Sequence, residues 1–334
     1  MSGIIGWDIG GVNTKAARVE NGRVVRAAVR PYEIQRDPAA LAPLLEATAA
    51  ALGGIPGDSH AVTMTAELSQ VFRTKREGVG AVLDAVCAAW GAAAIQIYSV
   101  DGVFLDPDSA RADALSVAAA NWRASAELVA STWADAVLVD MGSTTTDIIP
   151  IVGGRVRARG RTDPERLETG ELVYTGAVRT PAEALLPGLA AEGFALSGDV
   201  YLWRGQLAPA DYTFPTPDRR PATRQFAGER LARVICADRE MLDDRALDDI
   251  ATRLARAQLD RVREGLSRVL ARCPELRGST AVLAGIGAFI ARAAVEQAGL
   301  TPVPLSVAYG DNAVHAPAAA VALLLARALE VATR

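Results

Sequence analysis

Two glycine-rich segments carry the residues of this chain that are best suited to bind a phosphate group. The first reads Asp-Ile-Gly-Gly-Val-Asn-Thr-Lys over residues 8–15, and the second reads Asp-Met-Gly-Ser-Thr-Thr-Thr over residues 140–146. Glycine lets the backbone approach a ligand and turn its N–H groups toward it, and short hydroxyl side chains add further donors. The phosphate-binding residues predicted from these segments are Gly10, Gly11, Asn13, Thr14, Gly142, Ser143, Thr144 and Thr145.

The aspartates of the two segments are candidate metal ligands. Asp8 and Asp140 each stand where an apolar run that predicts a buried strand gives way to a glycine turn. Because carboxylates and phosphate oxygens together suit Mg²⁺, we expect both aspartates to hold this ion, directly or through water, and to be catalytic. Lys15 adds a cation just beyond the first turn and is a third catalytic candidate. The alternatives are that the aspartates only cap their turns and that Lys15 is a solvated charge.

A third glycine turn lies near the C-terminus. Gly285 and Gly287 follow an apolar run that predicts a strand, and they precede a segment with helical spacing. This position predicts ligand contact, and we assign both glycines to the phosphate-binding set. The alternative is that they only allow the helix to pack closely on the strand.

The first two segments belong to an internal duplication. Asp140 follows Asp8 by 140 − 8 = 132 residues, and the same offset relates Gly10 to Gly142. The register continues into two tight-turn pairs, because Asn-Gly at 21–22 corresponds to Gly-Gly at 153–154. Each copy therefore predicts a strand, a glycine turn, a second strand, a tight turn and a third strand.

The rest of the chain predicts an α/β protein of two lobes. The first lobe covers residues 1–133, and a final helix over 316–334 is expected to pack back on it. The second covers residues 134–315 and contains an irregular insertion at about 162–227 that is rich in Pro, Gly, Thr and Tyr. Helices are predicted over 38–52, 75–90, 110–131, 243–271, 288–298 and 316–332, and further strands over 61–64, 95–100, 279–285 and 304–308.

Composition excludes several classes of protein. A formal net charge of −4 over 334 residues gives no basic face for nucleic acid. No apolar run is long enough to span a membrane, and the first residues lack the features of a signal peptide. The three cysteines and two histidines are scattered, which argues against a zinc site or a disulfide framework. We expect a protein of the reducing cytoplasm without membrane or nucleic-acid partners.

Four longer segments, together with the glycine turns, carry a family resemblance. They are residues 65–68 with 72–79, then 120–122, 168–181, and the group formed by 198–202, 211–213 and 220–224. With these segments the chain resembles the hydantoinase/oxoprolinase family of the sugar kinase/Hsp70/actin superfamily. Within it, the chain resembles the subgroup of tetrahydromethanopterin-linked one-carbon transfer pathway proteins. It departs from typical hydantoinases at 13–15, where Asn-Thr-Lys replaces the usual Thr-x-Thr-Asp pattern, and it lacks a histidine cluster.

The resemblance implies a fold and a reaction. The fold is a pair of RNase H-like lobes of the actin/hexokinase/Hsp70 type around a central cleft, with Asp8 and Asp140 facing one another. The reaction belongs to methanofuran or methylofuran biosynthesis, where an alkyl or aryl transferase joins an aminomethyl-furanylmethyl diphosphate to the phenol of a tyramine- or tyrosine-type acceptor. The glycine turns, Lys15 and Mg²⁺ would hold the diphosphate, without a need for ATP.

Several residues are candidates for binding the phenolic acceptor and for removing its proton. The phenol must lose a proton, and the candidate bases are Glu67, Glu168, Glu171 and Asp101, of which we assign Glu171 to the catalytic set. Arg73 and Lys75 are candidates for a substrate carboxylate or phosphate, and Tyr174 for an aromatic substrate pocket. The alternative functions are an ATP-dependent kinase or amide hydrolase, which would bind ATP, and a nucleotide-binding sensor. The sequence leaves open whether the protein forms a homo-oligomer.

Overall fold

The computed structural model describes residues 3–310 and 316–332, and the chain packs as two compact units. Unit 1 comprises Met1–Ala134, Ile151–Glu165 and Leu305–Arg334, and unit 2 comprises Asp135–Pro150 and Arg166–Pro304. The segment Ile151–Glu165, which the sequence placed in the second lobe, belongs to unit 1 because its strand β9 packs on helix α5.

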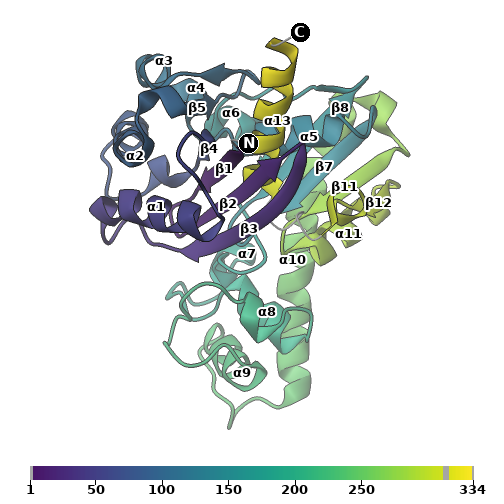
Figure 1. The fold of residues 1–334 in the computed structure, drawn as a ribbon. Coiled ribbons are helices and arrows are strands. Elements are labelled where there is room, and N and C mark those ends of the chain that lie inside the picture. The colour runs from purple at the N-terminus through teal and green to yellow at the C-terminus, as the bar shows by residue number, and fades with distance from the viewer. Residues whose placement is uncertain (1–2, 311–315, 333–334) are drawn as a thin grey trace. The chain divides into compact units, whose positions relative to one another are not determined.

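Unit 1 is built on a six-stranded mixed sheet in the order β3-β2-β1-β4-β5-β6 (Figure 1). Strand β1 pairs antiparallel with β2 and parallel with β4, so β1 and β4 end at the same edge of the sheet. The strands are β1 Ile4–Ile9, β2 Asn13–Glu20, β3 Arg23–Pro31, β4 Ser59–Met64, β5 Ile95–Tyr98 and β6 Phe104–Leu105.

Alternation along β1 gives this sheet two buried faces. Ile5, Trp7 and Ile9 pack with helices α1 (Leu41–Ala51) and α2 (Lys75–Trp90). The opposite face carries α5 (Asn121–Ala130) and α13 (Ala316–Ala332), as Figure 1 shows. The last helix comes so close to β1 that a Cβ at Gly6 would stand 2.0 Å from the carbonyl oxygen of Ala318. Close packing of the C-terminal helix thus completes the core of unit 1.

Unit 2 repeats this arrangement around a second mixed sheet. Its order is β10-β8-β7-β11-β12, with β9 also paired to β8, and β7 runs parallel to β11. The strands are β7 Ala136–Met141, β8 Thr146–Val152, β10 Leu172–Val173, β11 Thr280–Ala284 and β12 Thr301–Pro304. Strand β9 (Arg155–Val156) pairs with the last two residues of β8, and these paired residues lie in the segment that belongs to unit 1. Helix α11 (Ala288–Gln297) packs on β7 and β11. The α/β fold class predicted from the sequence is confirmed.

The tight turns confirm the duplication at the level of the backbone. In the first copy Asn21 and Gly22 have φ values of 51° and 69°, and in the second Gly153 and Gly154 have values of 59° and 70°. Two consecutive residues with positive φ define a type I′ turn, whose twist matches that of a β-hairpin. Equivalent sequence positions therefore adopt equivalent conformations.

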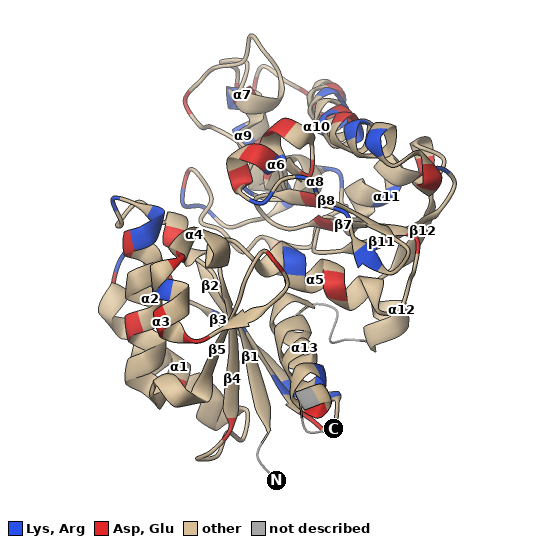
Figure 2. Cartoon of the chain, turned by 90° about the horizontal axis from the view of Figure 1, so that it is seen from above, with Lys and Arg blue, Asp and Glu red and all other residues tan. Residues whose placement is uncertain are grey.

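The insertion of unit 2 consists of short helices gathered along the long helix α10 (Asp244–Arg272), as Figure 1 shows. They are α7 Ala182–Leu185, α8 Ser197–Trp203 and α9 Arg224–Arg233, preceded by α6 Asp163–Thr169. Helix α10 buries an apolar stripe. Many of its other positions are basic or acidic residues, coloured blue and red in Figure 2. The predicted helix over 243–271 is confirmed.

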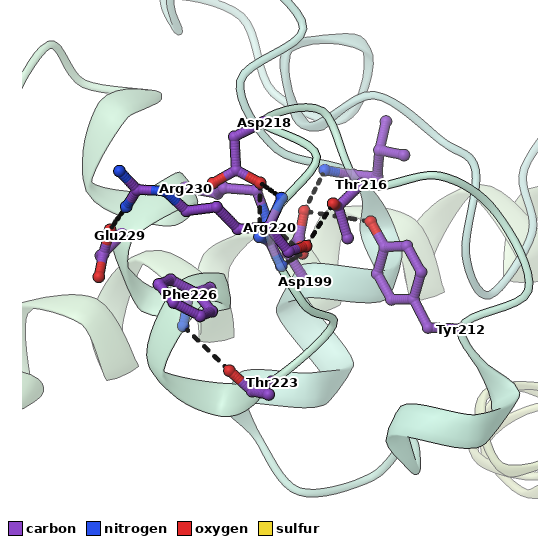
Figure 3. A network of polar contacts seen from close by, with 10 residues as sticks. Asp199, Tyr212, Thr216, Asp218, Arg220, Thr223, Phe226, Glu229 and Arg230 are labelled. Carbon is purple, nitrogen blue, oxygen red and sulfur yellow. Dashed lines mark hydrogen bonds and ion pairs between the residues drawn. The ribbon is translucent and has the colours of Figure 1, made fainter.

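A buried ion pair organises the insertion (Figure 3). Arg230 on α9 and Asp199 on α8 are both fully buried, and their charged groups are 2.7 Å apart. Arg230 also contacts Asp218 at 3.0 Å, and Tyr212 donates a hydrogen bond to Asp199. Two of the segments that carry the family resemblance, 198–202 and 211–213, therefore meet in one polar network.

Two predicted elements are wrong. The single helix predicted over 110–131 is three helices, α3 (Pro107–Ala112), α4 (Ala114–Val117) and α5. Asp113, with φ −112° and ψ 61°, separates the first two, and Ala119, left-handed with φ 51°, lies between α4 and α5. The strand predicted over 304–308 is the short helix α12 (Ser306–Tyr309), and the strand β12 before it ends at Pro304.

The remaining short helices are η1 Pro38–Ala40, η2 Ala66–Leu68, η3 Ala92–Ala94, η4 Pro209–Asp211 and η5 Pro274–Leu276. Within the described ranges, no helix is long and apolar enough to cross a membrane.

Candidate functional site

The first glycine turn closes the hairpin between β1 and β2. The amide of Gly10 donates a 3.0 Å hydrogen bond to the carbonyl of Asn13. Asp8 pairs with Lys15 on β2 and with Thr63 on β4, so these three side chains leave the same face of the sheet. The ammonium of Lys15 is 3.9 Å from a carboxylate oxygen of Asp8, and its side chain is 34% exposed. The hairpin therefore places a cation beside the candidate metal ligand.

Access to this turn differs from residue to residue. Gly10, Gly11 and Asn13 are half-buried, and no described atom lies within 4 Å of the place where a Cβ would stand on Gly11. Thr14 is fully buried, and among the described residues its hydroxyl has no hydrogen-bond partner. The backbone at Gly11 thus offers room for a ligand, whereas the Thr14 hydroxyl is enclosed by the fold. Contact between these residues and a phosphate stays a prediction.

The second glycine turn has the same backbone geometry. The amide of Gly142 donates a 2.9 Å hydrogen bond to the carbonyl of Thr145, at the same 132-residue offset as the bond in the first turn. Ser143, Thr144 and Thr145 are half-buried, and the nearest atom to a Cβ on Gly142 would be 3.8 Å away. The second turn therefore presents more hydroxyl groups than the first, with space beside its backbone.

A loop from the insertion holds the second turn in place. The amides of Ala177, Val178 and Arg179 donate to the carbonyls of Gly142 and Ser143 over 2.9–3.1 Å. A Cβ on Gly176 would stand 2.4 Å from the amide nitrogen of Thr144, so only glycine allows this approach. The segment 168–181 singled out in the sequence thus contains the support of the glycine turn.

This loop is fixed in turn by a buried polar layer. The amide of Gln258 on α10 donates 2.7 Å hydrogen bonds to the Thr175 hydroxyl and to the Gly176 carbonyl. Ser197 donates to the same carbonyl, and Tyr201 donates to the Gln258 side-chain oxygen. Buried hydrogen bonds of this kind select one backbone conformation. The long helix therefore determines the position of the turn.

The third glycine turn packs against the end of β7. Gly285 has φ 79°, and a Cβ there would stand 2.2 Å from the Met141 carbonyl oxygen and 2.6 Å from an Asp140 carboxylate oxygen. The amide of Gly287 donates to the Met141 carbonyl over 2.8 Å, and a Cβ on Gly287 would meet the Met141 side chain. Close packing explains both glycines and helps to position Asp140, whereas their contact with a phosphate stays a prediction.

A buried carboxyl group lies just beyond β4 in unit 1. Glu67, on η2, is 1% exposed, and neither carboxylate oxygen has a hydrogen-bond partner among the described residues. Its burial raises its pKa from 4.5 to about 7, against the opposing effect of Lys75, whose ammonium is 3.7 Å away. Lys75 also forms a 2.7 Å ion pair with Asp163. A carboxyl group that titrates near neutrality in this way is typical of acid–base catalysts.

The other predicted substrate and base residues are spread over the two units. Glu171 is fully buried in a 2.8 Å ion pair with Arg272, and its catalytic role stays a prediction. Glu168 and Arg73 are exposed, and Tyr174 is 58% exposed. Asp101 forms an exposed ion pair with Arg161. Arg73 and Tyr174 as substrate contacts stay predictions.

The carboxylates beside the glycine turns suit Mg²⁺ better than they suit a metal ion that takes all of its ligands from the protein. Among the described residues there is no group of three or more His, Cys, Asp or Glu side chains that could hold a metal ion. Mg²⁺ commonly uses one or two carboxylates and takes its remaining ligands from water and from substrate phosphates. Asp8 and Asp140, each beside a glycine turn, satisfy that requirement. The metal itself stays a prediction.

The family of the protein follows from comparison with known sequences. Residues 58–328 match the model of the hydantoinase/oxoprolinase family. The chain belongs to this family. It is also 35% identical over 339 residues to the "(4-{4-[2-(gamma-L-glutamylamino)ethyl]phenoxymethyl}furan-2-yl)methanamine synthase" of Methanocaldococcus jannaschii, and the alignment covers 98% of each chain.

Solved structures support the fold. An acetone carboxylase in its nucleotide-free form superposes with a TM-score of 0.61 at 12% identity, over 95% of this chain and 70% of the other. The activator of 2-hydroxyisocaproyl-CoA dehydratase from Clostridium difficile has a TM-score of 0.50 at 13% identity, over 99% and 98% of the two chains. At these identities the likeness concerns the fold alone, and it agrees with the RNase H-like strand order of the two sheets.

Proposed function

We propose that this hydantoinase/oxoprolinase family protein is a transferase of methanofuran or methylofuran biosynthesis. It joins an aminomethyl-furanylmethyl diphosphate to the phenol oxygen of a tyramine- or tyrosine-type acceptor and releases diphosphate. The observation that carries the proposal is the 35% identity, over 98% of both chains, to a synthase whose name describes a phenoxymethyl-furan product. The turn in unit 2 supports the proposal because its hydroxyl and backbone N–H groups can donate hydrogen bonds to the oxygens of a diphosphate.

The reaction exchanges one carbon–oxygen bond for another. The phenol oxygen forms a bond to the furanylmethyl carbon, the bond from that carbon to the diphosphate oxygen breaks, and diphosphate leaves with the electron pair. The phenol proton passes to a base. Because the furan ring stabilises positive charge on the reacting carbon, catalysis depends mainly on stabilising diphosphate as it leaves and on orienting the phenol.

The glycine turns and their cation provide what the leaving group requires. Backbone amides near Gly11 and Gly142 and the hydroxyls of Ser143 and Thr144 donate to phosphate oxygens. Lys15 neutralises part of the developing charge. Mg²⁺ held by Asp8 and Asp140 would supply further stabilisation of the negative charge on diphosphate.

Glu67 replaces Glu171 as the favoured base. A base for a phenol needs a carboxylate that attracts protons more strongly than an exposed one does, and burial gives Glu67 a pKa of about 7. The charged groups that act on it are Lys75 from α2 and Asp163 from the start of α6. Glu171 is instead held in a 2.8 Å ion pair with Arg272. The sequence alone put both residues among the candidates. Both are buried, and the cation beside each carboxylate distinguishes them: Arg272 lies 2.8 Å from Glu171, and Lys75 lies 3.7 Å from Glu67.

Activity is expected to rise with pH through about 7, because Glu67 must be ionised to accept the phenol proton. Glu67→Gln is expected to lower kcat about 100-fold or more and to abolish this rise, whereas Glu46→Gln, at an exposed glutamate of α1, leaves both unchanged. The measurement is kcat against pH from 5 to 9. An unchanged pH profile in the Glu67→Gln protein rules out Glu67 as the base.

The raised pKa of Glu67 also affects the stability of the fold, which can be measured without any substrate. The raised pKa of Glu67 means that its contribution to stability is complete below pH 4.5 and is lost as pH rises to about 7. The difference in free energy of unfolding between wild type and Glu67→Gln should therefore depend on pH in this window.

The reaction itself is tested by supplying the protein with Mg²⁺, the furan diphosphate and tyramine, γ-glutamyltyramine or tyrosine. We expect release of diphosphate that requires the phenol, together with an aryl ether detected by mass spectrometry. A parallel reaction contains ATP in place of the furan compound. Cleavage of ATP without the furan substrate, or absence of the ether with all three acceptors, contradicts the proposed transferase and favours the ATP-dependent alternative.

A further inference from the structure

The two copies of the repeat differ in the charge beside their glycine turns. In the first copy Lys15 follows the turn, and its ammonium lies near Asp8. The equivalent position in the second copy is 15 + 132 = 147, which is Asp147. Its carboxylate forms a 2.5 Å ion pair with the buried Arg166. The second turn therefore carries more hydroxyl groups than the first but no cation from the repeat itself.

An arginine from the insertion lies at this second turn. A guanidinium nitrogen of Arg179 is 3.3 Å from the hydroxyl oxygen of Thr144, and the backbone amide of Arg179 donates to the carbonyl of Ser143. The guanidinium also lies over the ring of Phe214, at 4.3 Å from its centroid. Backbone, hydroxyl and aromatic contacts thus act together to hold the side chain beside the turn.

This geometry suits an anion with several oxygens. Stacking on an aromatic ring uses the face of a guanidinium, whereas phosphate oxygens are bound by its edge. Arginine can donate two parallel hydrogen bonds to one phosphate, and such charge-assisted bonds are stronger than neutral ones. The half-buried hydroxyls of Ser143 and Thr144 lie on the turn that Arg179 contacts. A phosphate at this turn would meet hydroxyl, amide and guanidinium donors at once.

We infer that Arg179 binds the diphosphate group at the second glycine turn and takes the place that Lys15 has in the first copy. The inference rests on the proposed function for the identity of the phosphate compound, which is the furan diphosphate as substrate and diphosphate as product. Phe214 and Thr144 orient the guanidinium for this contact. The segment 168–181 accordingly has two tasks: it supports the turn through its backbone and it supplies the cation.

The test measures binding of inorganic diphosphate in the presence of Mg²⁺ by isothermal titration calorimetry, without turnover. Arg179→Met is expected to raise the Kd for diphosphate about 10- to 100-fold, the range for loss of a charge-assisted hydrogen bond. Arg179→Lys should recover only part of the affinity because an ammonium cannot form the bidentate, stacked contact. Arg263→Met, at an exposed arginine of α10 paired with Asp260, is the matched control and should bind like wild type.

The outcomes separate this inference from the proposed reaction. Equal affinity of wild type and Arg179→Met, or no binding of diphosphate by wild type, overturns the role of Arg179. Binding that depends on Arg179 in a protein that forms no aryl ether supports the diphosphate site and counts against the transferase alone. A circular dichroism melt of each variant verifies that the insertion remains folded.

Discussion

Replacing Asp140 by Asn is expected to lower kcat/KM about 100- to 1000-fold while leaving the protein folded, and Asp8→Asn should act in the same way. Asn preserves the size of each side chain but removes the negative charge that Mg²⁺ requires. Loss of a metal that neutralises a leaving group is worth several kcal/mol in the transition state, which corresponds to this range of rates.

The measurement is kcat/KM as a function of Mg²⁺ concentration, together with a thermal melt of each variant. The matched controls are Asp84→Asn in unit 1 and Asp260→Asn in unit 2, which change exposed carboxylates and should keep full activity. An Asp140→Asn protein within about threefold of the wild-type rate at every Mg²⁺ concentration contradicts the metal role of Asp140.

The second large effect concerns stability. Arg230→Met is expected to lower the free energy of unfolding by about 3–5 kcal/mol, because it leaves Asp199 buried without its counter-charge. Burial already raises the pKa of Asp199, and Arg230 is the strongest influence in the opposite direction. Urea unfolding followed by circular dichroism measures the change. The loss should be concentrated in the insertion, which this network organises (Figure 3).

Arg220→Met provides the control, since Arg220 lies beside the same network but forms a half-exposed ion pair with Glu229. Exposed pairs contribute about 0.2–1 kcal/mol, so this variant should unfold almost like wild type. In the double variant Asp199→Asn/Arg230→Met the stranded charge is removed, and part of the lost stability should return. Equal, small effects of Arg230→Met and Arg220→Met would show that the buried pair is unimportant.

Much of the fold could be predicted because the signals are local or repeated. The offset between Asp8 and Asp140 and the turn residues at 21–22 and 153–154 fix conformations that depend on a few neighbouring residues. Helices with long apolar stripes, such as α10, were predicted for the same reason. The prediction of one helix over 110–131 was wrong because the apolar spacing continues across Ala119. Nothing in the composition of the segment indicates the left-handed conformation of this residue.

The candidate site was predictable only in part. Glu171 and Glu67 are equivalent in sequence terms, since both are glutamates within specific motifs. Both are buried, and the structure separates them by their partners: Arg272 forms a 2.8 Å ion pair with Glu171, whereas the Lys75 ammonium is 3.7 Å from Glu67. The sequence analysis did not identify Arg179, because this residue lies outside the repeat. Comparison of Lys15 with Asp147 at the equivalent position indicates that the repeat provides no cation for the second turn.

The duplicated hairpins, the aspartates near the ends of their first strands and the family resemblance could all be read from residue types and their spacing. These depend on residue types at short range or on extended similarity. Three features became visible in the folded chain alone: which cation lies beside each buried carboxylate, which arginine contacts the second turn, and how Gly285 and Gly287 pack on the end of β7. The physical reason is that burial and charge pairing arise between residues far apart in the chain, such as Glu171 and Arg272, and no local pattern records them.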